Sequence, residues 1–161
     1  MSAQPMIERL RTPEEAQACA TLMAESEPWL TLRFNHAAVV AVLNGPTTEV
    51  YLARLNGEFT GHIQINMSGA FAGYIQTIAV APAWRNQGIG EALIHFAEQR
   101  IFRDSPNVFL CVSDFNLRAQ KLYARLGYER VGELKDYVIA GASEFLLRKT
   151  ISPKRDFKRT S

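Results

Sequence analysis

Apolar and polar positions alternate along several short segments of the chain. The clearest case is residues 59–67, where apolar residues occupy every second position from Ile63 to Met67 and polar residues stand between them. A period of two predicts a strand with one buried face and one polar face. By the same reasoning, or from short apolar runs between turn signals, we expect strands near residues 7–10, 50–54, 74–80, 108–112, 128–134 and 144–149.

Other segments carry start signals and apolar spacing of helices. Thr12 can cap a helix, Pro13 suits its first position, and Glu15 can return a hydrogen bond to the Thr12 amide. Near the carboxy end, Asn116 can cap a helix that Gly127 closes. We expect helices from residue 13 to before residue 28, over 36–43, from 89 to near 103, and from 116 to 127.

The predicted order of elements is β-α-α-β-β-β-α-β-α-β-β. The pair Asn56-Gly57 predicts a tight hairpin between the second and third strands. The pattern therefore indicates one mixed α/β (α+β) domain with a mostly antiparallel central sheet flanked by helices. We expect this domain to span residues 1–151 and residues 152–161 to form a mobile, basic tail.

Composition supports a single globular domain. The chain has 161 residues, of which 47% are hydrophobic and 21% charged, close to ordinary globular usage. Lys and Arg number 18 against 16 acidic residues, a net charge of +2, and part of the excess lies in residues 154–159. A dedicated duplex-DNA-binding protein is usually more basic, so we expect no nucleic-acid partner.

The chain shows no sign of a secreted or membrane protein. Its two cysteines, Cys19 and Cys111, provide no disulfide framework, and both fit core positions. The longest apolar run, Ala37–Leu43, is far shorter than the roughly 20 residues that span a bilayer. We expect a cytoplasmic protein without a membrane partner.

The most informative segment is the polar turn between the strand at 74–80 and the following helix. It consists of residues 85–90, Arg-Asn-Gln-Gly-Ile-Gly. A helix start offers free N–H groups to phosphate, and glycine lets a ligand approach the backbone. Leu93 stands where a dinucleotide fingerprint needs its third glycine, and Glu91 where a nucleoside-triphosphate loop needs lysine. By itself, the remaining Arg-x-x-Gly-x-Gly pattern also fits a plain glycine-bearing helix start.

Two motifs together resemble one enzyme family. The Arg-x-x-Gly-x-Gly turn, preceded by Ile78-Ala79-Val80, resembles the coenzyme A pyrophosphate loop of the GCN5-related N-acetyltransferase (GNAT) family. Residues 116–128 resemble its second signature, Asn-x-x-Ala-x-x-Leu-Tyr-x-x-x-Gly-Phe/Tyr. The resemblance covers about 60 residues and is nearest to the ribosomal-protein alanine N-acetyltransferase branch. The amino-terminal half matches in element order only.

The resemblance implies acetyl-coenzyme A as cosubstrate, bound where the fourth and fifth strands splay apart. The Ile78 amide would face the thioester carbonyl, the next two residues would pair with the pantetheine, and Arg85 with the following amides would hold the pyrophosphate. The implied coenzyme-binding residues are Ile78, Ala79, Val80, Arg85, Asn86, Gln87, Gly88, Ile89, Gly90, Glu91, Asn116 and Tyr123.

The family's general acid corresponds to Tyr123, whose phenol would protonate the departing thiolate. The alternative is a core tyrosine at helical spacing. Asn116 could cap its helix, contact the coenzyme, or do both. For the general base, the glutamate that some members carry is Tyr74 here. His62, Glu133 or a water chain remain candidates. Each of the two side chains is also explained as a solvated polar residue.

The expected reaction is acetyl transfer to a primary amine, either a protein amino terminus or a small molecule, by direct transfer in a ternary complex. Acidic and aromatic groups would suit a cationic acceptor, although the acids could be merely solvated and Trp29 merely buried. We expect no metal ion and either a monomer or a homodimer. The candidate acceptor-binding residues are Glu27, Trp29, Phe34, Tyr74 and Asp136.

Two rival functions remain open at this point. The domain could be a non-catalytic sensor of acyl-coenzyme A, which would bind coenzyme without turnover. It could instead be a nucleic-acid-associated protein that uses the basic residues 154–159.

Overall fold

The computed structural model describes residues 3–160 and contains the predicted elements in the predicted order. Its strands are β1 (Met6–Arg9), β2 (Thr48–Leu55), β3 (Glu58–Asn66), β4 (Tyr74–Val80), β5 (Asn107–Ser113), β6 (Glu129–Lys135) and β7 (Ser143–Thr150). Its helices are α1 (Pro13–Ala24), α2 (His36–Leu43), α3 (Ile89–Ile101) and α4 (Leu117–Arg125), with the short 3-10 helix η1 (Pro82–Trp84) after β4.

All the strands belong to one sheet of order β1-β2-β3-β4-β5-β7-β6. Only the central pair, β4 with β5, is parallel, and each other pair among the described strands is antiparallel. The hairpin between β2 and β3 turns at Asn56 and Gly57, with φ angles of 52° and 81°, as a tight hairpin requires. The predicted fold class is therefore confirmed.

The helix ends form as the sequence predicts. Thr12 accepts a hydrogen bond from the Glu15 amide and completes a capping box. Asn116 caps α4 by accepting from the Ala119 amide at 3.3 Å. Gly127 follows α4 with φ 92°, a left-handed conformation that glycine adopts without strain.

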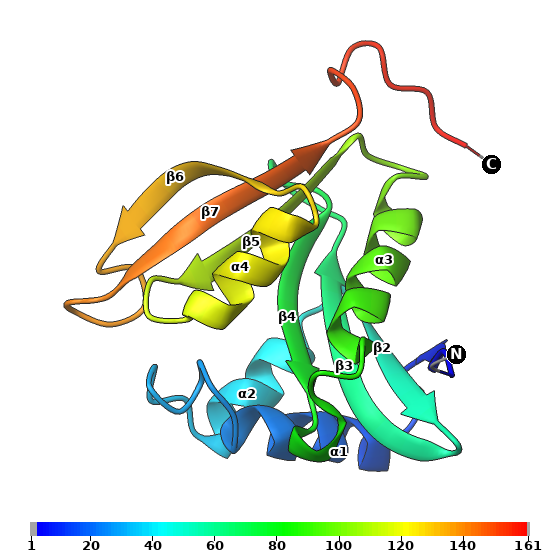
Figure 1. Cartoon of the computed structure of the whole chain (residues 1–161), viewed down its shortest axis with the longest axis vertical. Coiled ribbons are helices and arrows are strands. Elements are labelled where there is room, and N and C mark those ends of the chain that lie inside the picture. The colour runs from blue at the N-terminus through cyan, green and yellow to red at the C-terminus, as the bar shows by residue number, and fades with distance from the viewer. Residues whose placement is uncertain (1–2, 161) are drawn as a thin grey trace.

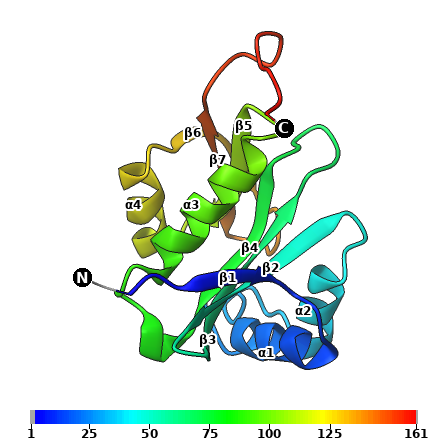
Figure 2. The ribbon, with the colours of Figure 1, turned by 90° about the vertical axis from the view of Figure 1, so that its right-hand side faces the viewer.

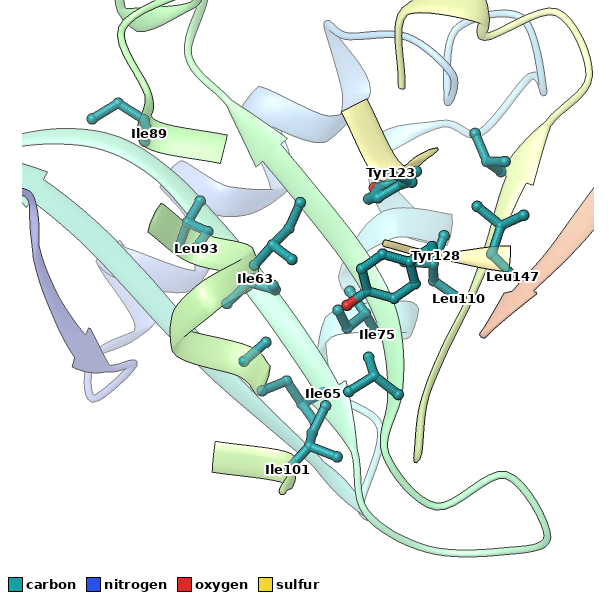
Figure 3. Packing of buried hydrophobic residues seen from close by; sticks show 14 of the residues in the cluster. Ile63, Ile65, Ile75, Ile89, Leu93, Ile101, Leu110, Tyr123, Tyr128 and Leu147 are labelled. Carbon is teal, nitrogen blue, oxygen red and sulfur yellow. The ribbon is translucent and has the colours of Figure 1, made fainter. Parts of the chain in front are cut away.

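Helices cover both faces of the sheet, α3 and α4 on one face and α1 and α2 on the other (Figure 2). The larger core lies under α3 and α4, where Leu93 of α3 packs with Ile63 of β3 and Leu110 of β5 belongs to the same cluster (Figure 3). The second core, under α1 and α2, includes Met23 and Val39, both fully buried.

The middle of the sheet is incompletely paired. β4 and β5 pair at only two positions, Tyr74 with Phe109 and Ile75 with Leu110, and the strands then diverge toward their carboxy ends (Figure 1). The rest of β4 pairs with β3 alone. The edge of β4 that faces β5 is therefore open from Gln76 onward.

Two predicted surfaces differ from the structure. His62 and Gln64, on the polar face of β3, are fully buried. The layer of α1 and α2 covers that face, and the Gln64 side-chain amide donates to the Val42 carbonyl of α2 at 2.7 Å. Conversely, Cys111 of β5, which was expected at a core position, is only half-buried, because the divergence from β4 opens that side.

Two further features concern the length of the helices and the course of the chain after β7. In the described residues no helix is long and apolar enough to cross a membrane. After β7 the chain returns toward the end of α3, where the Thr160 amide donates to the Arg103 carbonyl at 3.1 Å. The outermost residues of the predicted domain and tail, 1–2 and 161, lie outside the described part, and the mobility of the tail stays a prediction.

The buried His62 makes stability depend on pH. Burial lowers the pKa of this imidazole from 6.5 to about 4. Between these pH values the unfolded chain binds a proton that the folded protein does not bind, so the free energy of unfolding decreases as the pH falls. The loss attributable to His62 is about 3 kcal/mol. In urea titrations from about pH 7 to about pH 4, the variant His62→Gln should lose that much less than the wild type. Equal losses in the two proteins would contradict this assignment.

Candidate active site

A cleft opens where β4 and β5 diverge. Its volume is about 1010 Å³, and its walls come from β4, β5, the loop and first turn of α3, α4, the segment after α1 and the residues around the start of β7. Nearly every candidate residue named from the sequence contributes to these walls. One side of the cleft carries basic residues, and the other carries carboxylates and aromatic rings.

The loop before α3 is built to bind an anion. Asn86 and Gly88 both have positive φ, 61° and 82°, which turns the backbone sharply into the helix. Gly88 is the N-cap and offers no side chain to the first helical amides. The N–H groups of Ile89, Gly90 and Glu91 therefore have no partner within the helix, and the positive end of the helix dipole adds to their attraction for phosphate.

Arg85 and Gln87 use their side chains within the protein. The Arg85 guanidinium donates to the Val80 carbonyl at 3.1 Å and to the Ser26 hydroxyl at 3.4 Å, and so joins the end of β4 to the end of α1. The Gln87 side chain donates to the Ala83 carbonyl at 3.0 Å. Arg85 lines the cleft, whereas Gln87 does not.

Three basic residues of α4 also line the cleft, and the sequence analysis missed them: Arg118, Lys121 and Arg125. Their spacing of three and four residues places them on one face of the helix. This spacing is the signal in the sequence that could have indicated a basic helix face. Arg118 donates to the Asn86 side chain, and Arg125 forms an ion pair with Glu91 at 3.1 Å. The anion-binding loop and α4 thus form one positively charged wall.

Tyr123 lies in the wall of the cleft and is 6% exposed. Its ring packs edge-on against Tyr128, with centroids 5.8 Å apart (Figure 3). Burial raises the pKa of the Tyr123 phenol, so the phenol keeps its proton at neutral pH. Within the described residues its hydroxyl has no hydrogen-bond partner, whereas the Tyr128 hydroxyl donates to Glu98 at 2.9 Å. Of these two phenols, that of Tyr123 is therefore free to act on a ligand.

The unpaired part of β4 supplies backbone to the same cleft. Ile78, Ala79 and Val80 line it and pair with β3 on their other side. An extended ligand between β4 and β5 could therefore add to the open edge as a short extra strand.

The two side chains considered as general base do not reach the cleft. His62 is on β3, fully buried, and was wrongly considered as a solvated residue. Glu133 is exposed on β6 and pairs with Arg130 at 2.9 Å. Neither lines the cleft.

Four of the five acceptor-site candidates line the cleft, namely Glu27, Trp29, Phe34 and Tyr74. The Glu27 carboxylate accepts hydrogen bonds from the Thr31 amide and hydroxyl at 3.1 and 2.8 Å. The fifth, Asp136, lies outside the cleft and closes the turn before β7 by accepting from the Gly141 amide at 2.7 Å. The reason is local: Asp136 has φ 52°, a turn conformation that directs its carboxylate to its own loop.

Glu144 at the start of β7 lines the cleft as well, and the sequence analysis missed it. It stands opposite Ser113 in the pairing of β5 with β7. No local motif marks this position, because the register of two strands about 30 residues apart places it there. In residues 3–160 no group of three His, Cys, Asp or Glu side chains could hold a metal ion.

Comparison of the sequence with protein families gives one match for most of the chain. The model of the acetyltransferase (GNAT) family matches residues 9–128. The N-alpha-acetyltransferase RimI of Mycobacterium tuberculosis is 30% identical over 151 residues, which cover 86% of this chain and 88% of that protein. An uncharacterized protein of Mycobacterium leprae is 38% identical over 74 residues, but these span only 45% of this chain and 20% of that protein.

Solved structures share the fold. The ribosomal-protein-S18-alanine N-acetyltransferase from Escherichia coli superposes with a TM-score of 0.73 at 18% identity, covering 97% of this chain and 99% of that one. An aminoglycoside 6'-N-acetyltransferase solved with coenzyme A gives a TM-score of 0.73 at 17% identity, covering 94% and 99%.

The loop geometry makes a prediction about Gly88. A Cβ at Gly88 would meet no protein atom within 4 Å and would project into open space, and the same holds for Gly57 in the β2–β3 hairpin. Their φ angles are nearly equal, 82° and 81°, so Gly88→Ala and Gly57→Ala should each cost roughly 1 kcal/mol of stability. Only Gly88→Ala should weaken binding of coenzyme A, by roughly tenfold or about 1.4 kcal/mol, because only its new methyl group obstructs the anion-binding loop.

Calorimetric titration with coenzyme A and thermal melting of both variants check this. Equal coenzyme affinity of the two variants would show that the loop around Gly88 does not contact the ligand.

Proposed function

The chain belongs to the GNAT acetyltransferase family and is an acyltransferase, and on that premise we propose that it transfers the acetyl group of acetyl-coenzyme A to a primary amine. Transfer is direct, within a ternary complex of enzyme, acetyl-coenzyme A and acceptor. The observation that carries this proposal is the open edge of β4, which lines the same cleft as an anion-binding loop and the phenol of Tyr123.

The residues of the cleft fit the coenzyme. The amides of residues 88–91, with Asn86 and Arg85, would hold the pyrophosphate, and the basic side chains of α4 would add charge to this binding. Ala79 and Val80 would pair with the pantetheine along the open edge of β4, and Asn116 lines the same wall. The aminoglycoside acetyltransferase of the same fold, solved with coenzyme A, supports this assignment. When bound, acetyl-coenzyme A supplies an activated acyl thioester.

Two groups of this chain would act on the reacting atoms. The Ile78 N–H would donate to the carbonyl oxygen as negative charge develops on it, a contribution worth roughly 3 kcal/mol for a preorganised donor. Tyr123 would give its proton to the departing thiolate. In the overall reaction the N–C bond forms and the C–S bond breaks. An amine that starts as its ammonium cation loses two protons, one of which restores the Tyr123 phenol while the other passes to solvent.

The acceptor is a protein amino terminus or a small-molecule amine. The relationship to RimI supports the first class, and the shared fold with the aminoglycoside enzyme is compatible with the second. Glu27, Trp29 and Phe34 line the acceptor side of the cleft and offer negative charge and aromatic surface. These groups favour an acceptor that carries positive charge.

Replacing the Tyr123 phenol tests the reaction. Tyr123→Phe should lower kcat by about 100-fold or more, with unchanged affinity for coenzyme A and nearly unchanged stability, because the hydroxyl has no partner among the described residues. Tyr128→Phe is the matched control. It removes the hydrogen bond to Glu98 and should cost about 2 kcal/mol of stability, with much less effect on kcat.

The measurement is release of coenzyme A thiol from acetyl-coenzyme A against peptides, polyamines, amino acids and aminoglycosides. Coenzyme binding without turnover of any amine would favour an acyl-coenzyme A sensor over the proposed enzyme. Absence of coenzyme binding would contradict the assignment of the cleft.

A further inference from the structure

Glu144 lines the cleft and holds a buried carboxylate oxygen, Oε2, that makes no hydrogen bond to the described residues. The same is true of the Ser113 hydroxyl directly across the β5–β7 pairing. Ser113 is 2% exposed and also lines the cleft. Buried polar atoms are almost always hydrogen-bonded in folded proteins. The Ser113 hydroxyl is close enough to influence the Glu144 carboxylate, but a carboxylate has about four acceptor positions, so one hydroxyl leaves room for a donor from a ligand in the cleft.

The chemistry of the site restricts what the ligand can be. An ionised carboxylate only accepts hydrogen bonds, so the ligand must donate to it. Among residues 3–160 no cationic side chain pairs with Glu144. The neighbouring groups are all neutral or acidic: Tyr74 from β4, Cys111 and Ser113 from β5, Asp114 just after β5, and Tyr137 in the turn before β7. A carboxylate in an acidic and neutral neighbourhood favours a positively charged donor, such as an ammonium group.

The two faces of the sheet place this carboxylate opposite the coenzyme-binding wall. Val108, Leu110 and Val112 of β5 belong to the core under α3 and α4. Because side chains alternate along a strand, Ser113 and its cross-strand partner Glu144 face the other side, where α1 lies. An acceptor would therefore approach Glu144 from one face of the sheet, while the basic loop and α4 lie on the other.

We propose that Glu144 is the proton acceptor for the substrate amine and that the acceptor class is a primary amine bound as its ammonium cation. This inference rests on the proposed acetyl transfer. The Glu144 carboxylate takes one proton from the ammonium nitrogen, which frees the nitrogen lone pair to attack the thioester carbon. The N–C bond forms, the C–S bond breaks, and Tyr123 protonates the thiolate. The second nitrogen proton replaces the proton that Tyr123 gave, and the first leaves from Glu144 to solvent.

The environment of Glu144 makes it a better base than an exposed carboxylate. Burial, helped by the charge of Asp114, raises the pKa of Glu144 above its usual value of 4.5, and the Ser113 hydroxyl offsets part of this rise. The Cys111 thiol beside it is not a competing base, because burial raises its pKa and keeps it protonated.

The pH dependence of Glu144→Gln tests this role. At about pH 7.5 the variant should have a kcat/KM about 100-fold below wild type for a lysine-like amine of pKa about 10.4. The ratio of wild-type to variant kcat/KM should fall about tenfold for each unit of rising pH, because more of the amine is then already deprotonated in solution. This ratio should also be smaller for an α-amine of pKa about 8. Glu144→Asp should restore part of the wild-type profile. Glu133→Gln, which removes an exposed carboxylate outside the cleft, should match wild type.

A second readout does not depend on turnover. Because the folded-state pKa of Glu144 is raised, ionising it destabilises the folded protein as the pH rises above 4.5. The Tm of Glu144→Gln should therefore exceed that of the wild type at about pH 8, and the two should converge below about pH 4.5. Coenzyme A affinity, measured by calorimetry, should be the same in both.

The outcomes separate the two proposals. If the wild-type protein turns over no amine of the panel, both the proposed function and the role of Glu144 are contradicted. Wild-type turnover that Glu144→Gln leaves unchanged would contradict only the role of Glu144. A raised KM with an unchanged pH profile would overturn the base assignment as well, because it would make Glu144 a charge anchor that takes no proton.

Discussion

The cleft exists because most backbone groups of β4 and β5, in the middle of the sheet, do not pair with each other. β4 and β5 are the central pair, yet they exchange hydrogen bonds at two positions only. A strand edge left open inside a protein is costly unless another backbone or a ligand pairs with it. The fold maintains this opening because each half of the sheet is complete by itself, an antiparallel set β1–β4 and a second set β5-β7-β6. Substrate can therefore occupy a place in the sheet without competing with the protein's own pairing.

Two chemically different walls meet at this opening. The loop before α3 and the basic side of α4 form one wall, and Arg118 joins them through Asn86. The other wall comes from the segment after α1 and from the start of β7, and carries carboxylates and aromatic rings. On the proposed function, opposite charges at the two walls would orient two substrates of opposite charge, since an anionic phosphate and a cationic amine would each gain energy at one wall only.

Much of this arrangement could be predicted from the sequence. Local signals gave the elements, because caps, turn residues and apolar periods act over a few residues, as at Thr12 and Asn116. Most residues predicted to bind the coenzyme line one cleft, because they lie close together in the chain, and their contact with the coenzyme stays a prediction. On the acceptor side, four of the five residues named from the sequence line the cleft. Glu144 could not be predicted, because it reaches the cleft only through the register of β5 with β7. Burial of His62 was missed for a similar reason, because the helices that cover it come from a distant segment.

The chain order of the two walls has an evolutionary consequence. The residues proposed to face the coenzyme fall within one continuous stretch, from Ile78 to the end of α4, whereas those proposed for the acceptor side lie before and after it. Substitutions, insertions or changes of loop length near residues 25–34 and 136–144 can therefore alter what is acetylated while the stretch between them is inherited intact. On the proposed function, acceptor preference and coenzyme use would be separable traits, and descendants of one ancestor could diverge in the first while keeping the second.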